Sequence, residues 1–348
     1  MRSSNCWRNG SWQSPWQRDP VTIVVTGAAG FIGYHTSQAL LRSGRTVVGI
    51  DNVNDYYDPR LKEARVERLS RFPNFRFVRI DIANRSALTE ALAPERDISE
   101  IIHLAAQAGV RYSLIDPYAY VHSNLLGHVT ILELARSLPR LRHLVYASSS
   151  SVYGDSDAVP FRETDTADKP VSLYAATKRA DELISHAYGH LHGIPQTGLR
   201  FFTAYGPWGR PDMAYFAFAR AIADGAPITL YDEGRLQRDF TYIDDVVAGI
   251  LAVVGSPPPT GEPTRVLNIG NRQAESVATL VRLLEHELGR RAIIRHAARE
   301  AADVRLTCAS TDALEALVGY SPRTDLAAGI ARFVAWFRTW HPGVTKSA

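Results

Sequence analysis

The feature that most constrains the fold is a short apolar segment that runs directly into a glycine-rich turn. Val21–Thr26 is β-branched and almost wholly apolar, as expected of a central parallel strand covered on both faces. Gly27–Gly33 has the spacing G-x-x-G-x-x-G, and helical periodicity follows from Phe31 to Arg42. Glycine permits a tight strand-to-helix turn, and the helix N-terminus then offers free N–H groups to a pyrophosphate. This context makes the glycines stronger evidence for a dinucleotide site than the spacing alone.

Further apolar, strand-like segments alternate with helical ones along the first half of the chain. The predicted strands are Arg45–Ile50, Asn74–Ile80, Glu100–Leu104 and Leu141–Ala147, and the longest predicted helices are Tyr118–Ser137 and Leu173–Leu191. Strand alternating with helix indicates parallel β-α-β units. The predicted fold class is therefore α/β, with a Rossmann-type doubly wound parallel sheet.

The pattern loosens after about Gly198, where Gly and Pro become dense and the predicted strands are shorter. This change predicts a smaller C-terminal α/β domain for the substrate, and a chain of 348 residues is long enough for two domains. The predicted division is an N-terminal extension at 1–20, a cofactor domain at 21–197 and a substrate domain at 198–348. Some of the last domain, such as 240–255, is expected to pack back on the first.

Composition excludes several classes of protein. The 39 Lys and Arg residues against 36 Asp and Glu give a net charge of +3 without a basic run, so nucleic acid is not expected as a partner. Cys6 and Cys308 cannot form a disulfide framework or a cysteine-rich zinc site, and no metal site is predicted. No apolar run is long enough to span a membrane. A reducing, cytoplasmic location is the simplest interpretation.

The first twenty residues differ from the rest in containing three of the six tryptophans, Trp7, Trp12 and Trp16. The segment lacks a signal-peptide pattern, and we interpret it as a flexible extension. An interaction arm that uses the tryptophans as anchors is the alternative.

An acidic residue ends the second predicted strand. Asp51 lies 18 residues beyond Gly33, where a carboxylate can accept hydrogen bonds from an adenosine ribose. The same carboxylate would repel a 2′-phosphate, so it favours NAD over NADP. Asp81 and Ile82, just after the third strand, are placed to flank the adenine. An aspartate in an ordinary surface turn is the alternative for Asp51.

A tyrosine, a lysine and a serine run suggest proton transfer. Tyr174 and Lys178 are four residues apart, so they share one face of the predicted helix, and the ammonium can stabilise the phenolate of a tyrosine base. The predicted strand Leu141–Ala147 leads into four serines, Ser148–Ser151. Because strands of such a sheet end at the ligand crevice, a serine here can hydrogen-bond the oxygen that the tyrosine deprotonates.

Together these features resemble the extended short-chain dehydrogenase/reductase superfamily, through the glycine turn, His103–Ala106, the Ser/Tyr/Lys set and Arg238–Asp245. More narrowly, the sequence resembles the UDP-glucuronate 4-epimerases. Three long stretches carry this resemblance: Asp51–Asp58, Ala105–Ser113 and Arg200–Met213. It begins near Val21, so the N-terminal extension lies outside it.

The resemblance implies tightly bound NAD and reversible conversion of UDP-glucuronate to UDP-galacturonate through a 4-keto sugar. It implies that Tyr174 is the base, that Ser149 hydrogen-bonds the C4 oxygen, and that Lys178 tunes Tyr174 and holds the nicotinamide ribose. It also implies a homodimer, in which Tyr118–Ser137 and Leu173–Leu191 of each subunit form a four-helix bundle. The cofactor contacts implied are Gly27, Gly30, Phe31, Ile32, Gly33, Asp51, Asn52, Asp81, Ile82, Leu104, Ala105, Ala106, Tyr174 and Lys178.

The resemblance also assigns residues to the UDP-sugar. Ser150, Ser151 and Thr203 are neutral donors around the sugar, and Arg238 is the pyrophosphate ligand. Asp303 corresponds to a uridine-ribose contact, and the second phosphate ligand is left open. Arg111 and Arg210 are cationic candidates for the sugar carboxylate, although either could instead contact UDP or lie on the surface.

The serine run distinguishes related reactions. Sugar-nucleotide 4,6-dehydratases carry an Asp-Glu pair after the catalytic hydroxyl residue, and UDP-glucuronate decarboxylases carry Glu before Val-Tyr-Gly. Ser150 and Ser151 occupy these positions here. A decarboxylase, another UDP-sugar 4-epimerase and a non-catalytic NAD-binding scaffold or sensor are the alternatives. The complete Ser149, Tyr174 and Lys178 set argues against the scaffold.

Overall fold

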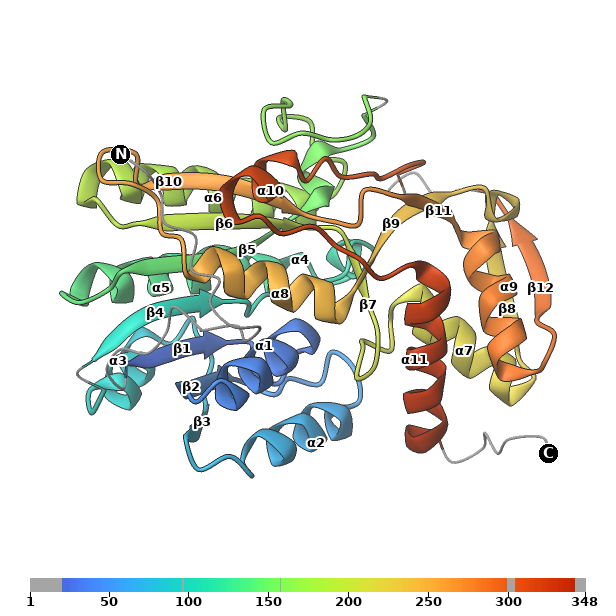
Figure 1. Cartoon of the computed structure of the whole chain (residues 1–348), viewed down its shortest axis with the longest axis horizontal. Coiled ribbons are helices and arrows are strands. Elements are labelled where there is room, and N and C mark those ends of the chain that lie inside the picture. Colours follow the sequence, from blue (N-terminus) through green and yellow to red (C-terminus); the bar gives the residue numbers. More distant parts are fainter. Residues whose placement is uncertain (1–20, 96, 157, 299–303, 342–348) are drawn as a thin grey trace, which may run out of the picture.

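The computed structural model describes residues 21–95, 97–156, 158–298 and 304–341. Its centre is a sheet of seven parallel strands in the order β10-β6-β5-β4-β1-β2-β3 (Figure 1). The strands are β1 (Thr22–Thr26), β2 (Thr46–Asp51), β3 (Phe75–Arg79), β4 (Ile98–His103), β5 (His143–Ser149), β6 (Gln196–Phe201) and β10 (Thr264–Ile269). The order reverses between β1 and β4, which confirms the predicted doubly wound sheet.

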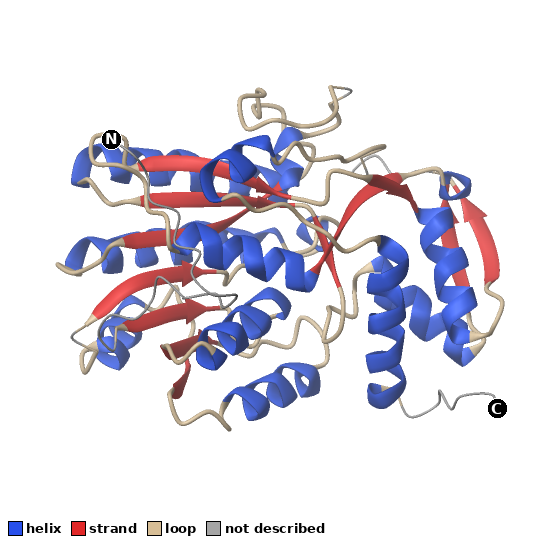
Figure 2. Cartoon of the chain, viewed as in Figure 1, coloured by secondary structure: helices blue, strands red, loops and turns tan. Residues whose placement is uncertain are grey.

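Helices cover both faces of this sheet (Figure 2). They are α1 (Phe31–Arg42), α2 (Pro59–Leu69), α3 (Arg85–Leu92), α5 (Gly127–Ser137), α6 (Leu173–His192) and α8 (Ile243–Val254). Alternate residues of β1 point to opposite sides: Ile23 and Val25 join the core under α1 and α8, whereas Val24 joins the core under α3 and α5. Burial on both faces explains why the strand is apolar at successive positions.

The predicted helix Tyr118–Ser137 is not a single regular helix. It consists of α4 (Pro117–Tyr120), a π-helical segment η2 (Val121–Leu126) and α5, and a short 3₁₀ turn, η1 (Tyr112–Leu114), precedes it. The π-helical segment η2 contains Asn124, whose side chain accepts from the backbone N–H of Gln107 at 2.8 Å and donates to the Thr177 hydroxyl at 2.9 Å. Asn124 thereby ties the loop after β4 to α6.

The smaller unit lies at the right of Figure 1. Its strands are β7 (Thr203–Tyr205), β8 (Pro227–Tyr231), β9 (Gln237–Tyr242), β11 (Ala274–Ser276) and β12 (Ile293–Ala297). Its helices are α7 (Ala214–Asp224), η4 (Asp232–Gly234), α9 (Val277–Leu288) and α11 (Leu326–Trp340). In the large unit, η3 (Ser150–Tyr153) follows β5, and α10 (Asp312–Val318) packs against β10 and α8 (Figure 1). The apolar face of α11 packs Phe333 and Phe337 against Phe216 of α7.

The two units do not divide at one point in the chain. The predicted boundary between 197 and 198 falls inside β6, and β10, far into the second half, pairs with β6 in the large sheet. Helix α8 packs against α1 and β5, in the region where 240–255 was predicted to return to the first domain. The predicted extension at 1–20 lies outside the described residues. Among the helices that are described, none is both long and apolar enough to cross a membrane.

Candidate active site

A cavity of about 660 Å³ opens where β1, β2, β4 and β5 end. It brings together nearly all the side chains singled out from the sequence, although they come from widely separated segments. The predicted residues that line it are Gly27, Gly30, Phe31, Ile32, Gly33, Asp51, Asn52, Asp81, Ile82, Leu104, Ala105, Ala106, Arg111, Ser149, Ser150, Ser151, Tyr174, Lys178, Thr203, Arg210 and Arg238. Asp303 lies outside the described residues.

The glycine turn forms one end of the cavity. Gly27 has φ +70°, and a Cβ on Gly33 would lie 2.0 Å from the carbonyl oxygen of Gly27, so a side chain cannot be accommodated there. Helix α1 begins at Phe31 after Gly30, with no side chain capping its first N–H groups. Bare backbone amides at a helix N-terminus fit a pyrophosphate.

Asp51 is fixed beside this turn. Its carboxylate accepts from the backbone N–H of Ala29 at 3.1 Å and of Val53 at 2.8 Å, and burial raises its pKa. Next to it, the Asn52 amide donates to Asp81 at 3.1 Å. A carboxylate held by backbone N–H groups keeps lone pairs for ribose hydroxyls, so the residues present fit the adenosine end of NAD.

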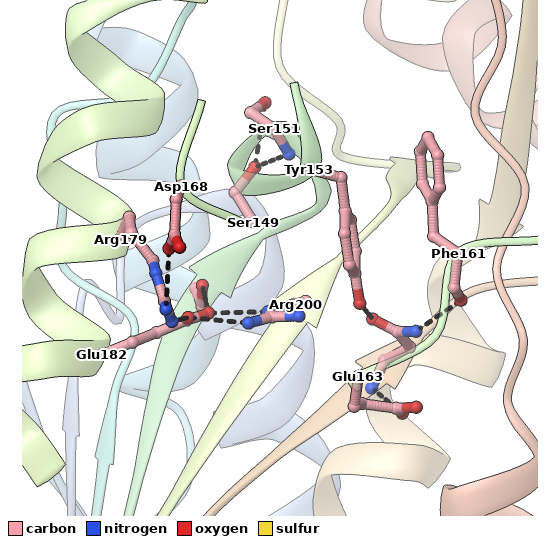
Figure 3. A network of polar contacts seen from close by, with 11 residues as sticks. Ser149, Ser151, Tyr153, Phe161, Glu163, Asp168, Arg179, Glu182 and Arg200 are labelled. Atoms are coloured by element: carbon pink, nitrogen blue, oxygen red, sulfur yellow. Dashed lines mark hydrogen bonds and ion pairs between the residues drawn. The ribbon is translucent and has the colours of Figure 1, made fainter. Parts of the chain in front are cut away.

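The predicted catalytic groups lie at the opposite part of the cavity. The Ser149 hydroxyl, at the end of β5, accepts from the N–H of Ser151 at 3.2 Å and donates to its hydroxyl at 3.1 Å (Figure 3). Tyr174 is the second residue of α6, which Ser172 caps by accepting from the N–H of Ala175 at 3.1 Å. The end of β5 and the start of α6 thus face one cavity.

The ammonium of Lys178 has a partner that sequence reasoning missed. Its Nζ donates to Asp181 at 2.8 Å, and both side chains are almost completely buried. Burial raises the pKa of Asp181 to about 6, although the charge of Lys178 opposes this shift. The only signal for the pair in the sequence is a spacing of three residues on a helix.

A buried ion pair holds β5, β6 and α6 together behind the serines. The Glu182 carboxylate accepts from the Ser148 hydroxyl at 2.6 Å and from two nitrogens of Arg200 at 2.8 Å each, and Arg179 also donates to it (Figure 3). Burial alone would raise the pKa of Glu182, but Arg200 outweighs it and the pKa lies below its usual value. These contacts fix the strand that carries Ser149 relative to the helix that carries Tyr174.

The three arginines assigned to the substrate have different neighbours. Arg210 donates to Asp212 through Nε at 3.1 Å and Nη2 at 2.5 Å. Arg111 lies over the ring of Tyr231, 4.6 Å from its centroid. Arg238 donates to the backbone carbonyl of Gln237 at 2.8 Å. All three arginines line the cavity, and a guanidinium group can bind an anion.

Comparison with known proteins identifies this arrangement. Residues 23–270, most of the chain, match the model of the NAD dependent epimerase/dehydratase family. The chain belongs to this family. Membership confirms the predicted superfamily, the Rossmann-type fold and NAD as the cofactor.

Comparison with individual relatives is more specific than the match to the family. The chain is 46% identical over 329 residues to a probable UDP-glucuronate 4-epimerase of Rhizobium meliloti, covering 90% of this chain and 96% of that protein. It is 46% identical over 343 residues to UDP-glucuronate 4-epimerase 4 of Arabidopsis thaliana, covering 94% and 78%. The crystal structure of UDP-glucuronic acid 4-epimerase from Bacillus cereus, in complex with UDP-glucuronic acid and NAD, matches with a TM-score of 0.85 and 33% identity, covering 92% and 100%.

The cavity is also lined by side chains of this protein that were not singled out as site residues from the sequence. Tyr56, Lys62, Gln107 and Asp212 all line it. Tyr56 and Asp212 were within stretches that carried the resemblance, but nothing in their spacing showed that they meet. Within 21–95, 97–156, 158–298 and 304–341, no three His, Cys, Asp or Glu side chains are grouped so as to hold a metal ion.

Proposed function

We propose that this protein interconverts UDP-glucuronate and UDP-galacturonate by epimerisation at C4, with NAD as a resident cofactor. The observation that carries the proposal is the convergence of Ser149, Tyr174 and Lys178 on a cavity whose other end is the glycine turn. The 46% identity to UDP-glucuronate 4-epimerases over nearly the whole chain supports the same substrate.

Each residue of the site has a separate role in the proposed reaction. Tyr174 takes the proton of the C4 hydroxyl, Ser149 hydrogen-bonds that oxygen, and the charge of Lys178 stabilises the phenolate. The glycine turn, Asp51 and Lys178 would hold NAD, which would supply a reversible hydride acceptor for C4, and inversion at C4 would require the keto sugar to turn over in the cavity. Arg238 holds the pyrophosphate throughout, because a guanidinium matches phosphate oxygens in a bidentate manner.

The serines after Ser149 address a chemical hazard. Oxidation at C4 places a ketone β to the carboxylate, and such acids lose CO₂ when the breaking bond aligns with the carbonyl π system. Ser150, Ser151 and Thr203 line the cavity and offer neutral donors that can hold the carboxylate out of that alignment. No carboxylate side chain stands at either serine position, which favours epimerisation over decarboxylation.

The test is incubation of the purified protein with UDP-glucuronate, followed by separation of the nucleotide sugars. UDP-galacturonate is the expected product, and UDP-xylose as the main product would overturn the proposal. Tyr174→Phe should abolish turnover. Tyr188→Phe is the matched control, because Tyr188 lies on the same helix and its hydroxyl contacts only Glu133, at 2.9 Å, among the bonds seen here.

We also propose that the protein is a homodimer through α4, η2 and α6, which pack beside one another. These elements expose large apolar side chains to an extent that is unusual for one surface. They are Tyr118 (82% exposed), Val121 (46%), Leu126 (50%), Leu183 (57%) and Leu191 (70%). A second copy would cover them. Sedimentation should show a dimer at micromolar concentration, and Leu183→Glu should give monomers; a wild-type monomer would contradict the interface.

A further inference from the structure

Arg210 is not a lone cation in the cavity. Asp212 accepts from its Nε and Nη2, and the same carboxylate accepts from the hydroxyl of Tyr56 at 3.0 Å. Tyr56 follows β2 in the large unit, whereas Arg210 and Asp212 precede α7 in the small one. All three line the cavity, so the cluster bridges the two units beside the substrate space.

The position of Tyr56 is well defined. Its ring packs against that of Tyr112 with centroids 4.8 Å apart, and a Cβ on Gly109 would lie 2.4 Å from its hydroxyl. Burial, followed by the charge of Asp212, raises the pKa of Tyr56 to about 12, so the phenol stays protonated and donates. Burial opposes ionisation of Asp212, but Arg210 holds its pKa below the usual value.

The charges then limit how firmly Arg210 can hold a second anion. Arg210 and Asp212 neutralise each other, and their side chains are only 22% and 29% exposed. A sugar carboxylate arriving at Arg210 would share one guanidinium with Asp212, and like charges this close repel. Its grip is therefore weaker than that of an unpaired arginine. The proposed reaction needs weak binding of the carboxylate, because the carboxylate must leave its first position when the keto sugar turns over.

We propose that Asp212 is a positioning residue that weakens the hold of Arg210 on the sugar carboxylate, so that the sugar can turn over during each catalytic cycle. This inference rests on the proposed function and takes Arg210, which lines the cavity, as the cation that meets the carboxylate before the sugar turns over. Tyr56 has the opposite effect. Its hydroxyl donates to the Asp212 carboxylate, which weakens the competition of that carboxylate for Arg210. Asp212 therefore lowers the affinity of Arg210 for the sugar carboxylate, and Tyr56 raises it.

Kinetics of two variants test the proposal. Asp212→Asn removes the competing charge, so KM for UDP-glucuronate should fall about fivefold to tenfold, the size expected of one typical net hydrogen bond. The kcat should fall as well, because tighter binding of the ground state does not help the transition state. Tyr56→Phe keeps the ring but frees Asp212, so KM should rise. A rise in KM for Asp212→Asn would overturn the proposal, because a purely structural role predicts weaker binding.

A binding measurement separates this inference from the proposed function. Calorimetry in a Tyr174→Phe background compares UDP-glucuronate with UDP, which lacks the carboxylate. Asp212→Asn should increase the ratio of the two affinities about fivefold to tenfold, with UDP binding unchanged. An unchanged ratio would overturn the inference even if the wild type is an active epimerase. An increased ratio in a protein that forms no UDP-galacturonate would support the weakened hold of Arg210, but it would contradict the proposed function and the role of that hold in turnover.

Asp232→Asn is the matched control in both experiments. Asp232 pairs with Arg235 at 2.7 Å on the surface of the small unit, where Arg235 is 66% exposed, and neither lines the cavity. Its KM, kcat and affinity ratio should equal those of the wild type. A change in the control equal to that of Asp212→Asn would show a general charge effect and would contradict a specific role for Asp212.

Discussion

Glu182→Leu is expected to destabilise the protein strongly, because it leaves a buried cation without its partner. The side chains of Glu182 and Arg200 are 2% and 3% exposed, and two bonds of 2.8 Å join them. Leucine approximately keeps the volume but offers no acceptor to Arg200 or to the Ser148 hydroxyl. Removing one partner of a buried ion pair costs about 3–5 kcal/mol. For a chain of 348 residues, Tm should therefore fall by roughly 4–7 °C.

The assay is thermal unfolding followed by circular dichroism, with NAD in excess in every sample. Glu67→Gln is the control, because Glu67 and Arg71 form a pair on the surface of α2 and are both about 70% exposed, so its loss should cost less than about 1 kcal/mol. Glu182→Leu combined with Arg200→Met removes both charges and should recover most of the loss. Equal Tm values for Glu182→Leu and Glu67→Gln, or a double variant no better than the single one, would refute the reasoning.

Three further predictions follow from other contacts. Gly33→Ala should reduce bound NAD at least about tenfold, measured by its release on denaturation, because the new Cβ would lie 2.0 Å from the Gly27 carbonyl oxygen; full occupancy would contradict it. Asn124→Leu should cost about 1–3 kcal/mol in denaturant unfolding for each buried group of Gln107 and Thr177 left unpaired, and an unchanged midpoint would show that η2 does not depend on these bonds. Burial raises the pKa of Asp181 from 3.8 to about 6, so the native state binds this proton more tightly than the unfolded chain between those values. The stability of the wild type relative to Asp181→Asn should therefore be greatest in acid and fall as pH rises through 6; titrations at several pH values that show no such fall would contradict the shift.

Much of the candidate site was predictable because its parts depend on short-range geometry. The glycine turn is specified by sterics within seven residues, and Tyr174 and Lys178 share a helix face because they are four residues apart. The glycine turn follows one strand directly, the serine run lies at the end of another, and strands of a parallel sheet end at a common edge. The line of argument from Val21–Thr26 to a dinucleotide site therefore needed only local pattern and one topological rule.

Two features of the fold could not be predicted from the local sequence pattern. The period of Tyr118–Ser137 predicts a helix, but it does not reveal the π-helical turn at Val121–Leu126, because the Asn124 side chain in that turn bonds to Gln107 and Thr177, which lie elsewhere in the sequence. The division at 197 and 198 followed a change in composition. Strand β6 crosses that point because its partners, β5 and β10, lie on either side of it in the sequence.

The sequence by itself determined the parallel sheet, the glycine turn and the serine, tyrosine and lysine that line the cavity, since these follow from periodicity and from motifs a few residues long. Only the tertiary structure decided which charges meet. Tyr56 and Asp212 are 156 residues apart in the chain, and Glu182 contacts both Ser148 and Arg200 on two different strands. Whether an arginine in the cavity is unpaired or already shared with a carboxylate depends on how the two units pack. No spacing along the chain encodes how the two units pack, and the role proposed for Asp212 beside Arg210 rests on that packing.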